Sequence, residues 1–110
     1  MASTDAINTA MELIAGAGDS RSYALEAVMQ AKAGDVAGAR ETLGKAKDAM
    51  IDAHDIQTSL LRAEMSGEPD SRTELCLLMV HAQDHLTSAL LMRDLAAEFI
   101  DLYERLQEKR

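Results

Sequence analysis

The sequence predicts an all-α protein, an antiparallel three-helix bundle formed by a single domain that covers residues 1–110. The first observation behind this class is composition: the chain has no Trp, one Phe, two Tyr and one Pro, and it is rich in helix-favouring residues. The second is periodicity, because apolar residues recur at steps of three and four along three stretches that short turn-forming segments separate. A length of 110 residues with 47% hydrophobic content suits one compact domain.

The formal net charge of -8 argues against binding to nucleic acid or to an anionic membrane surface, because both need clustered Lys and Arg. The longest uninterrupted apolar run, residues 75–80, is far shorter than the roughly 20 residues that span a bilayer. The first residues have neither the basic start nor the apolar run of a signal peptide, and the lone Cys76 cannot form an internal disulfide. We therefore expect a soluble, cytoplasmic protein.

The first helix is predicted over about residues 4–33, with Ser3 or Thr4 as its N-cap. Its apolar positions follow helical spacing at Ile7, Ala10, Ile14, Ala17, Ala24, Val28 and Ala31. Gly16 and Gly18 each cost about 1 kcal/mol relative to Ala in a helix, so two shorter helices are the alternative. We expect one helix, in which these small residues allow a close approach.

The second helix is predicted over about residues 36–63. Gly34 suits the left-handed position after the first helix, and Asp35 suits the N-cap of the second. Steps of three and four alternate strictly through Val36, Ala39, Leu43, Ala46, Met50, Ala53, Gln57 and Leu60. This spacing is typical of a helix that packs nearly parallel to its neighbours.

The third helix is predicted over about residues 71–107. Residues 66–70, Ser-Gly-Glu-Pro-Asp, carry the densest turn signals of the chain. Ser71 and Glu74 follow with the spacing of a capping box, in which each side chain accepts a hydrogen bond from the backbone of the other residue. Neither Gly nor Pro interrupts the chain from there onward.

This third helix has two apolar stripes. The first, which can face the other two helices, contains Leu75, Met79, Ala82, Leu86, Ala89, Ala96 and Ile100. The second lies roughly on the opposite side and contains Leu77, Val80, Asp84, Ser88, Leu91, Leu95 and Leu102. We expect an oligomer to cover the second stripe. The alternative is a splayed bundle that buries both stripes within one subunit.

Asp84 interrupts the second stripe, where burial of a lone ionised carboxylate would cost several kcal/mol without a proton, a partner or a metal. If copies of Asp84 converge on a symmetry axis, a shared divalent cation with oxygen ligands would relieve their repulsion. The alternative is an Asp that bonds to a neighbouring side chain or stays exposed at an edge.

His81 and His85 are one helical turn apart, so their imidazoles should be neighbours on one helix surface close to Asp84. A neutral imidazole nitrogen is nucleophilic near neutral pH and can carry a phosphoryl group. The same His-x-x-x-His spacing can instead bind zinc, although Ala82 stands where a zinc hydrolase would have its Glu general base. From the residues alone, a structural or weak metal-binding role stays open.

Residues 80–86, Val-His-Ala-Gln-Asp-His-Leu, and residues 53–60, Ala-His-x-x-Gln-Thr-x-Leu, resemble the enzyme IIA component of the lactose/cellobiose (chitobiose) class of the bacterial phosphoenolpyruvate-dependent sugar phosphotransferase system. The likeness extends over most of the chain and includes Ala-Lys-x-Gly-Asp at residues 31–35. The sequence departs from the expected pattern at Thr87, where we expect Met, and in the Ala-Gly-Ala-Gly run at residues 15–18.

The resemblance implies a homotrimer of three-helix subunits that acts as a phosphotransferase system enzyme with a phosphohistidine intermediate. His81 would accept phosphate from the phosphocarrier protein HPr and pass it to a cysteine of the IIB component. That component then phosphorylates the sugar as the membrane IIC component imports it. Cellobiose, chitobiose and lactose all remain open as the transported sugar.

The resemblance also implies that Asp84 contributes to a metal site shared between the trimer subunits, with one divalent cation, expected to be magnesium, per trimer. His85 and Gln57 are candidate supporting groups for the phosphoryl transfer, and His54 is a further one. A different class of function is the alternative: a non-catalytic helical adaptor or regulatory bundle whose His pair binds a metal.

Overall fold

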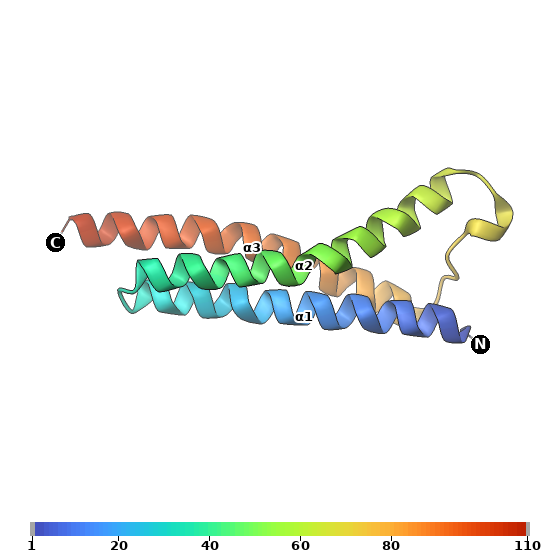
Figure 1. Cartoon of the computed structure of the whole chain (residues 1–110), viewed down its shortest axis with the longest axis horizontal. Helices are drawn as coiled ribbons and strands as arrows, with labels where there is room; N and C mark the ends of the chain where they lie inside the picture. The colour runs from blue at the N-terminus through green and yellow to red at the C-terminus, as the bar shows by residue number, and fades with distance from the viewer. Residues whose placement is uncertain (1, 110) are drawn as a thin grey trace.

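The computed structural model describes residues 2–109, in which three long α-helices lie side by side (Figure 1). They are α1 (Thr4–Lys32), α2 (Val36–Met65) and α3 (Leu77–Glu108), with a short 3₁₀ turn, η1 (Pro69–Ser71), in the linker before α3. Consecutive helices run in opposite directions, which confirms the predicted all-α, three-helix architecture. The molecule is elongated, with principal dimensions of 60 × 23 × 18 Å.

The first helix is continuous through both glycines, as expected. The Ser3 hydroxyl caps its start by accepting a hydrogen bond from the Ala6 N–H at 3.1 Å. A Cβ atom added at Gly16 would lie 3.0 Å from the Cβ of Ala53 on α2, whereas one added at Gly18 would meet open space. Gly16 therefore lies at a close contact between α1 and α2, and only a residue without a side chain fits there without a shift.

The turn between α1 and α2 forms as its residues predict. Gly34 adopts a φ of 100°, in the region that L side chains rarely enter, and the Asp35 carboxylate accepts a hydrogen bond from the Gly38 N–H at 2.9 Å. The C-terminal part of α3 is tied to this turn, because the Gln107 side-chain amide donates to the Gly34 carbonyl oxygen at 2.7 Å.

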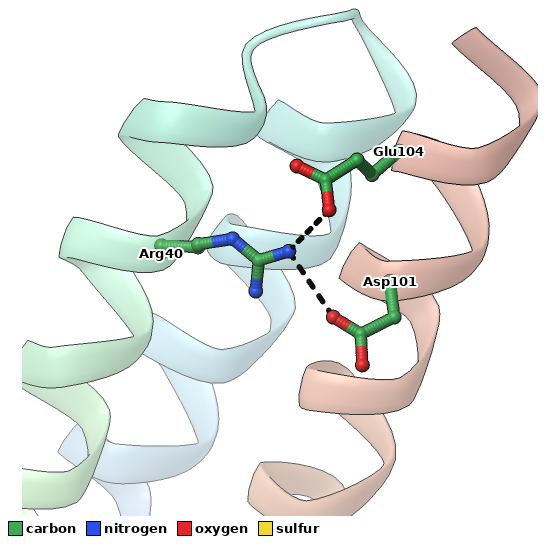
Figure 2. Close-up of polar contacts among 3 residues, drawn as sticks. All are labelled: Arg40, Asp101 and Glu104. Carbon is green, nitrogen blue, oxygen red and sulfur yellow. Dashed lines mark hydrogen bonds and ion pairs between the residues drawn. The ribbon is translucent and has the colours of Figure 1, made fainter. Parts of the chain in front are cut away.

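A second tie joins α3 to the start of α2. The Arg40 guanidinium reaches between two carboxylates on consecutive turns of α3, at 3.1 Å from Asp101 and 2.9 Å from Glu104 (Figure 2). All three side chains are exposed, so the attraction is screened by water and contributes modestly to stability. The contact instead helps to orient α3 against α2, because one planar guanidinium group bonds to both carboxylates.

The predicted start of the third helix at residue 71 is wrong. The helix begins at Leu77, six residues later, and its N-cap residue, Cys76, makes no side-chain capping hydrogen bond. Residues 72–76 are not helical, and η1 ends at Ser71.

The predicted capping box fails because both of its side chains have other partners. The Ser71 hydroxyl is within hydrogen-bond distance of two carbonyl oxygens, that of Glu68 at 2.8 Å and that of Ala63, near the end of α2, at 2.9 Å. The Glu74 carboxylate accepts from the backbone N–H of Ser3 at 2.9 Å, at the start of α1. These contacts with distant segments hold the linker against the ends of the other two helices.

The interior lies along α1, which packs against both other helices. Small residues dominate this interior and let the helices approach closely, with Leu13, Met50, Leu86 and Ile100 as the largest apolar side chains that are fully buried. The first predicted stripe of α3 is buried as expected, except for Leu75, which lies outside the helix and is 84% exposed. Within residues 2–109, no helix is both long enough and apolar enough to cross a membrane.

Candidate functional site

Two imidazoles meet on the surface of α3, one helical turn apart. The Nε2 atoms of His81 and His85 are 3.0 Å apart, within hydrogen-bond distance, and the ring centroids are 4.4 Å apart. The ring planes cross at 82°, so one ring presents its edge to the other. His81 is exposed and His85 is half-buried. The predicted proximity of the two side chains is therefore confirmed, and His81 is open to a partner molecule.

This arrangement suits nucleophilic chemistry at a nitrogen. In a neutral pair, one ring donates its Nε2–H to the lone pair on the other ring's Nε2, and either ring can be the donor depending on its tautomer. If His85 is the donor, the bond keeps the His81 Nε2 deprotonated and its lone pair available. When that lone pair takes up an electrophile, the His85 N–H is free to turn to the newly attached group.

Asp84 does not belong to this His pair. It is exposed on the outward stripe of α3. Among residues 2–109 of one chain, no three His, Cys, Asp or Glu side chains are grouped so that they could hold a metal ion. A metal at Asp84 would therefore need ligands from other copies of the chain or from water.

The outward stripe of α3 is unpartnered in the single chain, so the alternative of a splayed bundle that buries both stripes is wrong. Its apolar members range from 42% exposed at Val80 to 85% exposed at Leu77. Two further exposed residues, not among the predicted members, belong to the stripe: Phe99 lies between Leu95 and Leu102, and Leu106 extends the stripe toward the C-terminus. A large apolar surface of this kind commonly marks a protein interface.

The candidate supporting residue Gln57 lies elsewhere. Its side-chain Nε2 donates to the Oε1 of Gln83 at 2.8 Å, and the Gln83 Nε2 lies 3.6 Å from the sulfur of Met79. Because successive residues of a helix are about 100° apart, Gln83 and His81 lie on nearly opposite sides of α3. Within one chain, Gln57 is thus beside Gln83, and its role in catalysis stays a prediction.

Gln57 and Gln83 line a mainly apolar hollow of about 240 Å³. It forms where the C-terminal half of α2 diverges from the other helices and the linker curves back toward α3 (Figure 1). Gln83 was not among the predicted site residues. Its position four residues after Met79 was the available signal, since that spacing places it beside the buried stripe rather than on the outward face.

His54, the third histidine, is also separate from the His pair. It is exposed on α2 and lines a small hollow of about 140 Å³ together with Lys47 and with Arg93 of α3. The Arg93 guanidinium lies 3.3 Å from the carboxylate of its neighbour Asp94. Because His54 lies apart from His81 and His85, substitution of His54 can serve as a control for substitutions in the pair.

Comparison with known proteins gives a consistent family match. The family model described as "PTS system, Lactose/Cellobiose specific IIA subunit" matches residues 8–104. The chain is 46% identical to the lichenan-specific phosphotransferase enzyme IIA component of Bacillus subtilis, over 90% of this chain and 87% of that protein. It is 40% identical to the N,N'-diacetylchitobiose-specific EIIA component of Escherichia coli K12, over 88% and 81% of the two chains.

Solved structures agree. The crystal structure of the cellobiose-specific enzyme IIA from Bacillus anthracis superposes with a TM-score of 0.90 at 44% identity, covering 100% of this chain and 97% of that one. The IIA(chitobiose) chain in the solution structures of its complex with HPr, from Escherichia coli, matches with a TM-score of 0.78 at 34% identity, covering 96% and 99%.

Proposed function

This chain belongs to the lactose/cellobiose-specific IIA family of the sugar phosphotransferase system, and we propose that it carries phosphoryl groups on His81. The observation that supports this site is the exposed imidazole of His81, whose Nε2 faces that of His85 at 3.0 Å. No other pair of histidines in the sequence has this spacing, since the chain contains three His in all. The non-catalytic adaptor has no comparable support from the relatives.

In the proposed reaction, the lone pair on the His81 Nε2 attacks the phosphorus atom that HPr presents. The new N–P bond forms as the bond between phosphorus and the donor atom on HPr breaks, with donor and acceptor in line. The His85 Nε2–H then donates a hydrogen bond to a phosphoryl oxygen, which offsets part of the negative charge there. The complex of a related chitobiose IIA with HPr supports HPr as the donor.

The second half of the cycle reverses these steps with a different partner. We propose that a cysteine thiolate of the IIB component attacks the phosphorus on His81, so that the N–P bond breaks and the imidazole returns to its neutral form. IIB then delivers the phosphoryl group to the sugar that the membrane IIC component imports, and this carrier works on the cytoplasmic side. Because His81 must serve two partners in turn, its exposure fits the role.

We also propose that three copies associate through the outward stripe of α3. The exposed apolar side chains of this stripe, from Leu77 to Leu106, support the assembly because an association would remove them from water. Asp84 interrupts the stripe, so three carboxylates would converge on the axis of such a trimer. Their oxygen atoms suit one magnesium ion, which would supply positive charge to offset their repulsion.

Phosphorylation in a reconstituted system tests the proposed function. The purified chain is incubated with phosphoenolpyruvate, enzyme I and HPr, and its mass is measured under alkaline conditions, which preserve phosphohistidine. We expect wild type and the matched control His54→Gln to gain one phosphoryl group per chain and His81→Gln to gain none. A folded wild-type chain that gains no phosphate would overturn the carrier function, and a phosphorylated His81→Gln would overturn the choice of residue.

A further inference from the structure

We propose that His81 and His85 together form a chelating site for a late first-row transition-metal ion of the Ni²⁺ type, and that this ion and the phosphoryl group exclude each other. The binding of the ion follows from the geometry of the two rings alone. The mutual exclusion rests on the proposed function of His81.

The separation of the two nitrogen atoms fits one metal ion. Metal–imidazole bonds are about 2.05 Å long, so two Nε2 atoms 3.0 Å apart correspond to an N–metal–N angle of about 94°. Neighbouring ligands of an octahedral or square-planar ion are about 90° apart, which is the preference of Ni²⁺ and Cu²⁺. A tetrahedral Zn²⁺ ion would require the nitrogens to be about 3.3 Å apart. The observed separation is closer to the first geometry.

The two rings can turn to take up such an ion without movement of the backbone. Both project from adjacent turns of one continuous helix, so their backbone positions are already fixed relative to each other. In a neutral pair joined by this hydrogen bond, one Nε2 carries the proton that it donates to the other. When that ring moves its proton to Nδ1, both Nε2 lone pairs can point at the ion, and the step requires no net loss of a proton.

The residues around the two histidines predict a site that exchanges its metal ion readily with solvent. Within residues 2–109, no third His, Cys, Asp or Glu side chain is placed to join the pair, so water would complete the coordination. His81 is exposed, which leaves room for those waters. The net charge of -8 raises the local concentration of cations around the protein. Asp84, with its hard oxygen ligands and outward direction, suits a different ion.

The ion would occupy the same lone pair that the proposed phosphoryl transfer uses. A metal on the His81 Nε2 prevents attack on phosphorus, and a phosphoryl group on that atom removes one of the two metal ligands. Thermodynamic linkage makes this relation reciprocal. The factor by which the metal lowers the equilibrium constant for phosphorylation equals the factor by which phosphorylation lowers the affinity for the metal. The His pair would then make sugar uptake sensitive to free transition metal.

Binding is tested first, without any phosphorylation reaction. Ni²⁺ is titrated calorimetrically into the full, untagged chain in the presence of excess Mg²⁺, which fills oxygen sites and leaves imidazoles free. We expect one Ni²⁺ per chain for wild type and for His54→Gln, the control that removes the unpaired histidine. His85→Gln and His81→Gln should each bind on the order of 10²-fold more weakly, because a two-ligand chelate becomes a single ligand. Equal affinities in wild type and His85→Gln would overturn the site.

Exclusion is tested next, with HPr that has been phosphorylated and separated from enzyme I beforehand. Saturating Ni²⁺ should slow phosphoryl transfer to wild type at least tenfold, and a chelator should restore the rate. His85→Gln keeps the acceptor His81 but lacks the chelate, so the same Ni²⁺ concentration should slow its own residual transfer far less. If Ni²⁺ binds wild type and leaves transfer unchanged, mutual exclusion is wrong. If transfer fails without Ni²⁺ while binding persists, the carrier function fails and the metal site stands.

Discussion

The side-chain amide of Gln57 on α2 donates a hydrogen bond of 2.8 Å to the side-chain amide of Gln83 on α3. This bond joins the C-terminal half of α2 to α3, and both side chains line the hollow of about 240 Å³. Both side chains are half-buried, so loss of either one leaves the other amide poorly hydrated. The pair thus links the diverging half of α2 to the helix that carries the two imidazoles.

We predict that Gln57→Ala and Gln83→Ala each lower the free energy of unfolding by about 1 kcal/mol. The double variant should lose less than the sum of the two, because both single changes remove the same hydrogen bond. Urea denaturation of the four proteins completes this cycle. Strictly additive losses would mean that the bond contributes nothing to stability.

For His85→Gln, we predict a folded protein that HPr still phosphorylates, at a rate reduced by about 10- to 100-fold. The nucleophile remains, while the hydrogen bond to the phosphoryl oxygen becomes weaker or less well placed. Mass spectrometry of samples quenched at successive times gives the phosphorylation rates of this variant, of His81→Gln and of wild type. A rate equal to that of wild type would show that His85 does not assist the transfer.

Asp84→Leu should leave the proposed trimer intact and make it more stable. The change removes three carboxylates from the axis and adds apolar contacts along the outward stripe of α3. Removing the cation from wild type with a chelator should have the opposite effect, because three ionised carboxylates then repel each other.

Analytical ultracentrifugation of wild type and Asp84→Leu, each with and without chelator, checks both statements. Ser88→Leu is a suitable control, because it adds apolar surface to the same stripe while keeping the carboxylate. A wild-type chain that is monomeric with magnesium present, or an Asp84→Leu chain that dissociates while keeping its helices, would place Asp84 away from any trimer axis.

The two glycines of α1 should respond in opposite directions to substitution. Gly18 faces open space, so Gly18→Ala should stabilise the protein by about 0.5–1 kcal/mol through helix propensity. Gly16 faces the Cβ of Ala53 at 3.0 Å, so Gly16→Val should destabilise it by about 1–3 kcal/mol through overpacking. Thermal unfolding followed by circular dichroism compares the two, and a stabilising Gly16→Val would contradict the close contact.

Glu74 should make a small, pH-dependent contribution to stability. The hydrogen bond from the Ser3 backbone N–H holds the pKa of the Glu74 carboxyl below its ordinary range. A lowered pKa in the folded state means that the contribution is present above the ordinary pKa and is lost as the pH falls through the lowered one. The melting temperature of Glu74→Ala should therefore fall below that of wild type at neutral pH, and the difference should vanish in acid.

A matched control for this experiment is Glu68→Ala, which removes another exposed carboxylate of the same linker. Within the described residues, the Glu68 side chain accepts no hydrogen bond, so its substitution removes a carboxylate while the bond between Ser3 and Glu74 stays in place. If Glu68→Ala and Glu74→Ala behave alike, the effect is one of net charge and not of the bond to Ser3.

Local sequence patterns correctly predicted those features that depend on only a few neighbouring residues. Ser3, one of two predicted candidates for the first cap, and Asp35, the predicted second cap, each accept a backbone hydrogen bond from three residues further along the chain. The start of α3 was not predictable in this way. Ser71 and Glu74 have the local pattern of a capping box, but the Ser71 hydroxyl contacts the carbonyl oxygens of Glu68 and Ala63 instead. Glu74 is held by the Ser3 backbone, 71 residues away, and no local pattern reveals so distant a partner.

The same distinction applies to the candidate site. The contact between His81 and His85 follows from helical spacing alone, because both side chains belong to one helix. The position of Gln57 depends on how α2 is rotated against α3 and where the two diverge. Periodicity predicts the buried stripe of each helix but does not specify which flanking residues meet across the helix pair, so the bond to Gln83 was found only in the structure.

The ion pair between Arg40 and Asp101 joins residues that are 61 positions apart in the chain (Figure 2). By contrast, α1 and α2 are connected by a turn of only three residues, 33–35. Closing a short loop costs less conformational entropy than closing a long one, and contacts of low sequence separation form fastest. The α1–α2 hairpin therefore has the lower entropic barrier, and its surface can serve as the template on which α3 docks late in folding. We therefore predict that the ion pairs of Arg40 with α3 form after the α1–α2 hairpin.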